Sequence, residues 1–220
     1  MRVLMFTKYP APGRVKTRLA KSIGLEHAAG LQTAFIRDEL DMLRTLGAPV
    51  TLCCDPLAPL SEYRSLFGPH HFYAIQHGAD LGERMLHALH SALEKSVGAV
   101  LIGSDLPDLP ATHLRQAFAA LKTAPLCLGP APDGGFYLLG LSQPLPHGIF
   151  EAVPWGSAEV LTRTLANCEA RGLHPQLLAP WPDVDTLPDL LDYAHRNRHA
   201  LTHAMNYIRA HELAADAWKP

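Results

Sequence analysis

Short apolar runs alternate with longer amphipathic segments along most of the chain. Residues Arg2 to Phe6 form an aliphatic run, and Pro10 prevents its continuation, which is typical of a buried strand followed by a loop. From about Leu25 to Leu46, apolar side chains recur every three or four residues until Gly47, so this segment predicts an amphipathic helix. The same two patterns then recur toward the C-terminus.

The remaining elements are predicted in the same way. The predicted strands are 49–54, 72–75, 98–103, 126–128 and 136–141, and the predicted helices are 81–95, 111–122, 158–171 and a last one from 187 into a His-rich tail. This alternation indicates an α/β protein with a parallel sheet and helices on both faces. No repeat or composition break marks a second domain, so we expect one domain over residues 1–220, with 196–220 as a C-terminal helical tail.

The composition limits the class of protein. Hydrophobic residues make up 48% of the chain and charged residues 18%, which allows a large core and excludes a fully disordered chain. No apolar run approaches the roughly 20 residues of a membrane span, and the apolar start is too short for a signal peptide, so we expect a cytoplasmic protein without a membrane span. The four cysteines include no C-x-x-C pair, which predicts buried thiols.

Charge is unevenly distributed along the chain. The formal net charge of −2 gives no reason to expect a nucleic-acid or membrane partner. Residues 1–25, however, contain six basic side chains and no acidic one. An anionic ligand is therefore expected to meet this first segment.

The loop after the first predicted strand carries most of this positive charge. It reads Lys8-Tyr9-Pro10-Ala11-Pro12-Gly13-Arg14-Val15-Lys16-Thr17-Arg18-Leu19. Backbone N–H groups of a glycine loop, forked Arg donors and a Lys point charge all suit phosphate oxygens, and a solvated basic surface is the alternative. Neither a Walker A loop nor G-x-G-x-x-G is present, which argues against a P-loop NTPase or a dinucleotide site.

Two aspartates are candidate metal ligands. In open α/β sheets, ligands bind beyond the carboxyl ends of the strands, and Asp105 directly follows the predicted strand 98–103. Mg²⁺ is usually held by one or two carboxylates plus phosphate oxygens, which makes Asp105 a candidate, while helix capping suits Asp108 or Thr112 better. Asp185 is the second candidate, and capping of the last helix by Asp185 or Thr186 is the alternative.

Three further segments have less specific patterns. Asp133-Gly134-Gly135 stands just before the strand 136–141, where glycines either let a ligand approach the backbone or form a tight turn. His195, His199 and His203 recur every four residues and would line one helix face, which we interpret as an exterior polar stripe, with chelation of a transition metal as the alternative. Trp155-Gly156-Ser157 is the third segment, and on the family resemblance given below we interpret it as a packing segment.

Five segments together carry a family resemblance over about residues 1–195. They are the loop from Phe6 to Leu19, Asp80-Leu81-Gly82-Glu83-Arg84-Met85, Gly103-Ser104-Asp105-Leu106-Pro107, Asp133 to Gly140, and Asp183-Val184-Asp185-Thr186. In this order they resemble a bacterial family of GT-A-type transferases described as associated with radical-SAM/selenodomain genes. The resemblance implies the nucleotide-diphospho-sugar transferase superfamily, with a Rossmann-like three-layer α/β/α fold and a mostly parallel mixed sheet.

Two segments resemble particular groups within that superfamily. Lys16-Thr17-Arg18-Leu19 is similar to the loop of phospholactate guanylyltransferases, and Val184-Asp185-Thr186 resembles the late metal-binding segment of CMP-sugar synthetases. The similarity implies that Asp105 and Asp185 jointly hold Mg²⁺ or Mn²⁺. This chain departs from the family pattern at Leu187-Pro188-Asp189, where the family has Pro-Glu-Asp, and the departure concerns the geometry of the helix start beside Asp185.

These observations define the expected site. Catalytic roles are expected for Lys16, Arg18 and Asp105, and acceptor binding for Asp133, Gly134 and Gly135. Binding of the nucleotide and its phosphates is expected for Lys8, Gly13, Arg14, Lys16, Thr17, Arg18, Asp80, Gly82 and Arg84.

Three functions are compatible with that site. The leading one is nucleotidyl transfer from a nucleoside triphosphate to a phosphorylated metabolite with release of pyrophosphate, because four loop cations suit a triphosphate. Glycosyl transfer from a nucleotide sugar to a small-molecule acceptor is the second. A nucleotide-binding module without catalysis is the third.

Overall fold

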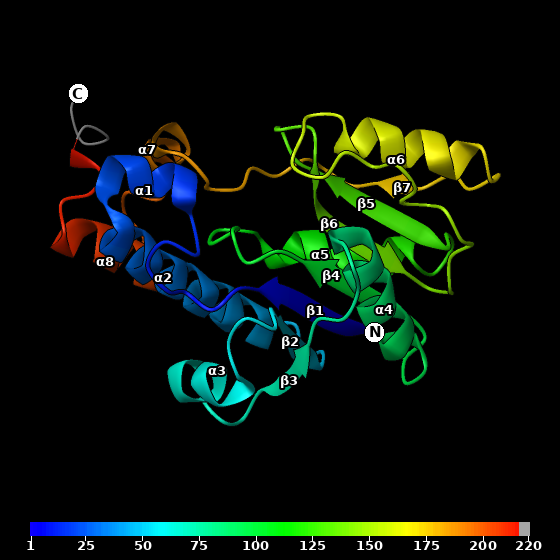
Figure 1. Ribbon diagram of the computed structural model, residues 1–220, viewed down its shortest axis with the longest axis horizontal. Coiled ribbons are helices and arrows are strands. Elements are labelled where there is room, and N and C mark those ends of the chain that lie inside the picture. Colours follow the sequence, from blue (N-terminus) through cyan, green and yellow to red (C-terminus); the bar gives the residue numbers. More distant parts are fainter. Residues whose placement is uncertain (216–220) are drawn as a thin grey trace.

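The chain alternates strands and helices in a computed structural model that describes residues 1–215 (Figure 1). The strands are β1 (Arg2–Thr7), β2 (Val50–Cys54), β3 (Phe72–Ile75), β4 (Ala99–Ile102), β5 (Leu126–Pro130), β6 (Phe136–Leu141) and β7 (Gln176–Leu177). The helices are α1 (Thr17–Ile23), α2 (Leu25–Arg44), α3 (Leu60–Phe67), α4 (Leu81–Leu93), α5 (Ala111–Ala120), α6 (Val160–Glu169), α7 (Leu187–Arg196) and α8 (His203–Ala210). The short elements α1, α3 and β7 are additions to the predicted set.

All seven strands belong to one sheet with the order β3-β2-β1-β4-β6-β5-β7. Strand β1 is parallel to both of its neighbours, and its Val3 pairs with Val50 of β2 and Val100 of β4. Strand β6 runs antiparallel to β4 and β5, because the tight turn between β5 and β6 makes them a hairpin. The sheet is therefore mixed and mostly parallel, as the family resemblance implies.

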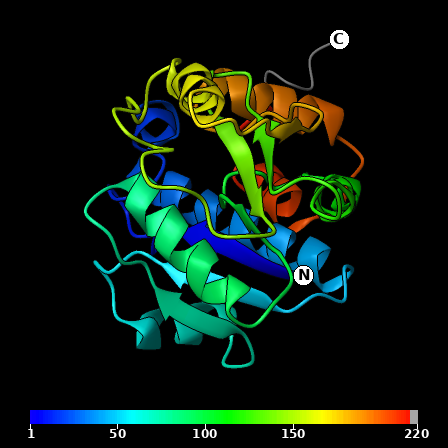
Figure 2. The ribbon, with the colours of Figure 1, turned by 90° about the vertical axis from the view of Figure 1, so that its right-hand side faces the viewer.

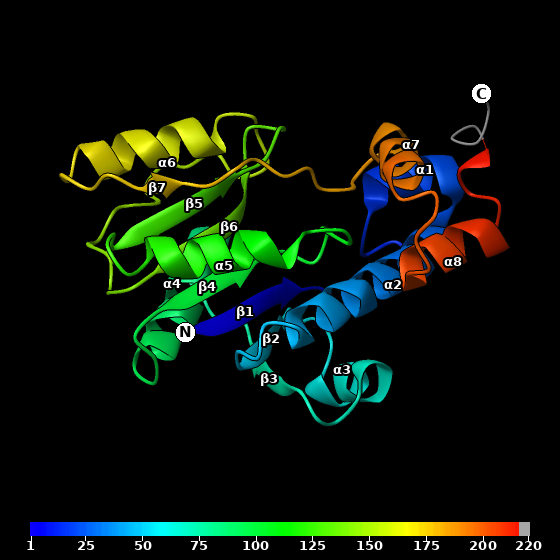
Figure 3. The ribbon, with the colours of Figure 1, turned by 180° about the vertical axis from the view of Figure 1, so that it is seen from behind.

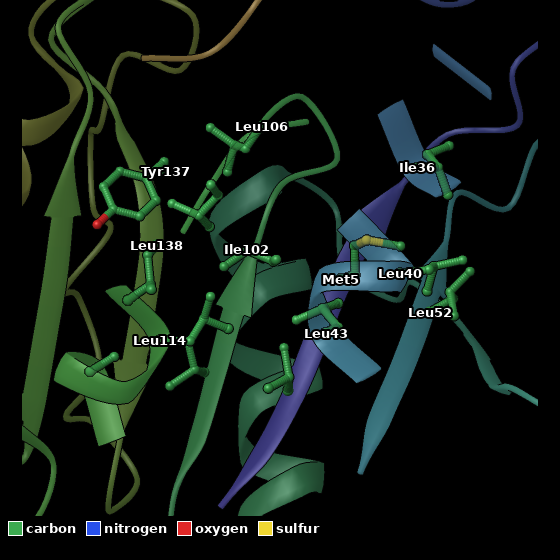
Figure 4. Packing of buried hydrophobic residues seen from close by; sticks show 14 of the residues in the cluster. Met5, Ile36, Leu40, Leu43, Leu52, Ile102, Leu106, Leu114, Tyr137 and Leu138 are labelled. Carbon is green, nitrogen blue, oxygen red and sulfur yellow. The ribbon is translucent and has the colours of Figure 1, made fainter. Parts of the chain in front are cut away.

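Helices cover both faces of this sheet and form the outer layers of a three-layer fold (Figure 2). Side chains of β1 alternate between the two cores, so that Met5 lies among residues of α2, α3 and α5 while Leu4 lies among residues of α4 and α6. Figure 4 shows the first core, where Ile36 and Leu40 of α2 pack against Met5. The four cysteines are free and buried, which confirms their interpretation as buried thiols.

A third apolar cluster lies beyond the carboxyl edge of the sheet. Helix α2 has 20 residues and is about 30 Å long, so its N-terminal half extends past the strands (Figures 1 and 3). There, Phe35 of α2 packs with Leu19 of α1, Tyr193 of α7 and Met205 of α8. These helices therefore form a wall beside the strand ends at which ligands bind in folds of this type.

The last predicted helix is two helices, which corrects the interpretation of the histidines. Helix α7 ends at Arg196 and α8 begins at His203, so His195, His199 and His203 do not lie along one helix face. Thr202 caps the start of α8 by accepting a hydrogen bond from the Met205 N–H at 3.2 Å. No helix within residues 1–215 is long and apolar enough to cross a membrane. Residues 216–220 of the expected helical tail lie outside the described residues.

Candidate functional site

A cavity of about 630 Å³ lies at the carboxyl edge of the sheet, between the strand ends and α1. Its size falls within the range of roughly 300–1,000 Å³ of small-molecule sites. The predicted site residues that line it are Lys8, Arg14, Lys16, Thr17, Arg18, Asp80, Arg84, Asp105 and Asp185. Asp133 and Gly135 line a neighbouring cavity, and Gly13, Gly82 and Gly134 line neither. The basic loop and both predicted metal ligands thus meet at one cavity.

Lys16 forms the centre of this arrangement. It precedes α1 with a left-handed backbone (φ 48°, ψ 42°), and its side chain is only 2% exposed. The ammonium Nζ lies 2.5 Å from Asp105 Oδ1 and 2.9 Å from Asp185 Oδ1. The guanidinium of Arg18 lies outside this pair, 63% exposed, and donates to Asp185 Oδ2 at 2.5 Å.

Backbone contacts explain why the two aspartates converge. The N–H of buried Val184 donates to the Asp105 carbonyl at 3.0 Å, which joins the segment before α7 to the turn after β4. The Asp189 carboxylate then accepts the N–H groups of Thr186 at 2.7 Å and Asp185 at 3.1 Å. Thr186 is therefore the cap of α7, and the Leu187-Pro188-Asp189 sequence preserves a well-formed helix start. The Asp185 side chain remains directed to the cavity.

Two side chains of α2 form hydrogen bonds to the backbone of the turn after β4. The buried Glu39 carboxyl accepts the Leu106 N–H at 2.8 Å, and the Gln32 amide donates to the Ser104 carbonyl at 2.7 Å. Burial raises the pKa of Glu39 well above its ordinary value despite that hydrogen bond. The position of Asp105 is thus fixed by hydrogen bonds to the backbone of Ser104 and Leu106 on either side of it. The alternative that Asp105 caps the next helix is wrong, because Pro110 is the residue that precedes α5.

The electrostatics of the site favour the ionised forms of Lys16 and Asp185. Burial by itself lowers the pKa of Lys16, but attraction by Asp105 and Asp185 outweighs it and leaves that pKa raised. Burial likewise opposes the charge of Asp185, whose pKa is nevertheless lowered by Lys16 and Arg18. Asp183 behaves in the opposite way, since burial and then repulsion by Asp185 raise its pKa to about 6.

The Lys16 contacts also test whether a divalent cation fits here. One ammonium nitrogen already lies within hydrogen-bond distance of both carboxylates, so Asp105 and Asp185 form a pocket for positive charge. Mg²⁺ and Mn²⁺ favour oxygen ligands and are commonly held by two carboxylates plus phosphate oxygens. Within residues 1–215 no cluster of three or more His, Cys, Asp or Glu side chains could hold a metal. The two aspartates therefore fit a cation that shares its coordination with a phosphate ligand.

The opposite wall contains residues that the sequence reasoning missed. Asp55, directly after β2, accepts the Leu57 N–H at 2.9 Å and pairs with Arg84 at 3.3 Å. Gln76, directly after β3, lines the same cavity and donates to the Cys53 carbonyl at 2.8 Å. The position of both at the carboxyl ends of strands is the signal that could have identified them, as it identified Asp105.

Two of the predicted glycines have packing roles in the structure. A Cβ on Gly82 would lie 2.8 Å from the Phe150 Cβ and 2.8 Å from the Trp155 ring. A Cβ on Gly134, which has φ 89°, would lie 2.1 Å from the Ala158 carbonyl oxygen. These glycines permit close approach of protein segments, which accounts for both positions without a ligand contact.

Comparison with known proteins places this geometry in context. Residues 39–157 match the family described as "Uncharacterized protein conserved in bacteria (DUF2064)". A crystal structure from Desulfovibrio desulfuricans G20, described as a candidate nucleotide-diphospho-sugar transferase, is 34% identical with a TM-score of 0.91, and the match covers 98% of this chain and 97% of that one. No curated protein matches.

More distant solved structures share the fold. The inositol-1-phosphate CTP transferase from T. maritima is 13% identical with a TM-score of 0.57, and the match covers 98% of this chain and 95% of that one. A cytidylyltransferase from Leptospira borgpetersenii is 13% identical with a TM-score of 0.56, covering 97% and 93%. At such identities the comparison establishes the fold alone.

Proposed function

The chain belongs to the bacterial DUF2064 family and is similar to a Desulfovibrio protein described as a candidate nucleotide-diphospho-sugar transferase, and from this premise we propose that it is a nucleotidyltransferase dependent on Mg²⁺ or Mn²⁺. The proposed reaction transfers a nucleotidyl group from a nucleoside triphosphate to a phosphorylated small molecule and releases pyrophosphate. Distant structural neighbours that share only the fold are named as cytidylyl- and CTP transferases, so nucleotidyl transfer is a reaction that proteins of this fold are named for.

The observation that carries the proposal is the Lys16 contact to Asp105 and Asp185 in a cavity with other cations. Lys8, Arg14 and Arg18 line the same cavity, so positive side chains and a cation-binding carboxylate pair face one space. In a polyphosphate with a bound divalent ion, the negative phosphates match the basic side chains and the positive ion matches the two aspartates. Arg offers forked donors to phosphate oxygens and Lys a compact charge, which suits the successive phosphates of a triphosphate.

The proposed transfer needs no protein nucleophile. An oxygen of the acceptor phosphate forms a bond to the α-phosphorus, the bond from that phosphorus to the bridging oxygen breaks, and pyrophosphate leaves with the electron pair. A phosphate monoester is largely deprotonated at neutral pH, so no base has to remove a proton. Lys16 and Arg18 stabilise charge on the departing phosphates, supported by Arg14 and Lys8. When bound, the divalent ion supplies further charge neutralisation, with Asp105 and Asp185 as its protein ligands.

Glycosyl transfer is the second candidate, and the description of the Desulfovibrio homologue as a candidate nucleotide-diphospho-sugar transferase favours it. In that reaction an acceptor oxygen attacks the anomeric carbon and a nucleoside diphosphate leaves. The same cations would stabilise that leaving group. Only the product separates the two reactions.

The test is a set of incubations of a panel of phosphate monoesters and sugars with each common nucleoside triphosphate or, separately, each common nucleotide sugar, with and without Mg²⁺. Release of pyrophosphate supports the proposal, and release of nucleoside diphosphate from nucleotide sugars supports glycosyl transfer instead. Tight nucleotide binding without turnover or metal dependence would show a non-catalytic module. Asp41→Asn, at an exposed carboxylate of α2 outside the cavity, is the matched control for Asp105→Asn, which should be inactive.

A further inference from the structure

A second cavity, of about 220 Å³, adjoins the proposed nucleotide cavity. Phe6, Leu81 and Gly103 line both, so the two spaces meet at the ends of β1 and β4 and at the start of α4. The second cavity is smaller than the roughly 300–1,000 Å³ of sites that enclose drug-sized molecules. It therefore has room for a group of about one ring, contiguous with the phosphates of the first cavity.

Apolar side chains dominate the lining of this second cavity. Phe136 and Trp155 face it from the start of β6 and from the loop before α6, and Met85 and Val160 add aliphatic surface. The two aromatic rings belong to one cluster, with centroids 6.4 Å apart and an edge-to-face angle of 76°. Such a surface favours burial of apolar area by about 25 cal/mol per Å².

The polar groups of the cavity are few and carry no positive charge. Asp133, Ser157 and the indole N–H of Trp155 are the polar side-chain groups of the described lining apart from the Tyr137 hydroxyl, which donates to the Ala179 carbonyl at 3.0 Å. Lys, Arg and His are absent from the described lining, whereas the adjoining cavity has five Lys and Arg side chains. An anionic group in the second cavity would thus meet the Asp133 carboxylate with no cation in the described lining, while Arg18, which attracts Asp133, lies in the adjoining cavity.

A polyhydroxylated group fits this lining poorly too. The Asp133 Oδ1 already accepts the Gly135 N–H at 2.9 Å, and the Ser157 hydroxyl accepts the Glu159 N–H at 3.2 Å. The Asp133 Oδ2, the Ser157 O–H and the Trp155 indole N–H are left for a ligand, and most of the other side chains of the described lining are apolar. Most hydroxyl groups of a sugar would therefore lose water without gaining a partner, and each unpaired buried hydroxyl costs free energy. The lining discriminates against both phosphate and polyol.

We propose that this second cavity holds the body of the acceptor, and that this body is an uncharged, mainly apolar group of about ring size. The inference rests on the proposed function, because the reacting phosphate of the acceptor then lies with the cations of the first cavity. The substrate class is a phosphate monoester of an apolar alcohol, in preference to a sugar phosphate. Ser157 lies at an exposed edge of the lining, so it offers a place to block the cavity.

The experiment compares two monoesters that share the phosphate and differ in the body. Binding of 4-fluorobenzyl phosphate to the full chain is followed by ¹⁹F NMR, and glucose 1-phosphate is measured by its competition. Ser157→Trp fills the second cavity, and Ser61→Trp, on the exposed side of α3 outside both cavities, is the matched control. Thermal unfolding of both variants verifies that they are folded.

We expect 4-fluorobenzyl phosphate to bind at least tenfold more tightly than glucose 1-phosphate. Ser157→Trp should weaken binding of the benzyl ester at least fivefold and leave the affinity for glucose 1-phosphate unchanged. Ser61→Trp should change neither affinity. Equal affinity for the two esters, or equal effects of the two variants, would overturn the assignment. Nucleotide binding is measured separately, so failure of the proposed function appears as absent nucleotide binding even where the benzyl ester binds.

Discussion

Lys16 and Asp105 form a sheltered ion pair that links the amino-terminal basic loop to the carboxyl end of β4. The Lys16 Nζ lies 2.5 Å from the Asp105 Oδ1, with the lysine side chain 2% exposed and the aspartate 43% exposed. Lys16, which we expected to bind phosphate, thus places its ammonium between Asp105 and Asp185, where we expected the metal ion. Binding of a divalent ion by Asp105 and Asp185 therefore requires the Lys16 ammonium to leave that position.

A first prediction concerns metal binding without nucleotide. Lys16→Met should tighten Mn²⁺ binding at least tenfold, because it removes the competing ammonium and leaves Asp105 unpaired, with Asp185 paired only with Arg18. Free Mn²⁺ measured by electron paramagnetic resonance gives this affinity directly. Lys21→Met, at an exposed lysine of α1, should bind Mn²⁺ as the wild type does. An unchanged affinity in Lys16→Met would mean that Mn²⁺ does not use this carboxylate pair.

A second prediction concerns nucleotide binding, where the same lysine has the opposite effect. Lys16→Ala should weaken nucleoside triphosphate binding in the presence of Mg²⁺ by about 1.5–3 kcal/mol, the range for charged hydrogen bonds. Arg18→Ala should cost less, because the guanidinium is 63% exposed and its interactions are screened by water. Calorimetric titration measures both. Losses below about 0.5 kcal/mol in each variant would indicate a solvated basic surface.

Glu39 should make stability depend on pH. Burial and then repulsion by Asp105 keep the pKa of Glu39 well above its ordinary 4.5, against the Leu106 hydrogen bond and attraction by Lys16. The folded state therefore binds more protons than the unfolded chain above pH 4.5, and stability is lost as pH rises through the raised pKa, by at most about 1.4 kcal/mol per pH unit.

Glu39→Gln should flatten this dependence, since the amide keeps an acceptor for the Leu106 N–H and cannot ionise. Urea unfolding between pH 5 and pH 8 is the measurement. Glu62→Gln, at an exposed glutamate of α3, should keep the wild-type profile. A Glu39→Gln profile parallel to the wild type would show that Glu39 is not the group responsible.

Gly82→Ala tests the packing role assigned to this glycine. The new Cβ would meet Phe150 and Trp155 at 2.8 Å each, so we expect a loss of about 1–3 kcal/mol in the free energy of unfolding. Nucleotide affinity of the folded variant should stay within twofold of the wild type. Ser91→Ala, on the exposed side of α4, should be neutral. A variant with wild-type stability and weakened nucleotide binding would restore the ligand contact first expected of Gly82.

The sequence patterns were sufficient for the architecture where elements were long and regularly apolar. Strand β4 is apolar throughout and α2 repeats its apolar side chains over 20 residues, so both were predicted close to their observed bounds. Helix α1 has only seven residues within a basic segment, too few for a clear periodic pattern. The break after Arg196 was missed because its causes, the Asn197 contacts to Asp108 and the Thr202 cap, depend on tertiary structure or local geometry.

Within the site, position along the chain predicted proximity but not orientation. The carboxyl-edge rule and the family resemblance together indicated that Asp105 and Asp185 lie near the basic loop, and the structure brings them together. The inward direction of Lys16 could not be inferred, because it depends on a left-handed backbone at a residue other than glycine. Asp55 and Gln76 were missed although they follow strands, since no charge cluster or motif drew attention to them.

The central claim is that the basic loop and the aspartate after β4 bind one polyphosphate through a shared divalent ion. The most direct measurement is calorimetric titration of each common nucleoside triphosphate with and without Mg²⁺, in wild type, Asp105→Asn and the control Asp41→Asn. We predict that Mg²⁺ tightens nucleotide binding at least tenfold in wild type and in Asp41→Asn. In Asp105→Asn, the nucleotide affinity should be the same with and without Mg²⁺. Equal tightening by Mg²⁺ in all three proteins would contradict the account.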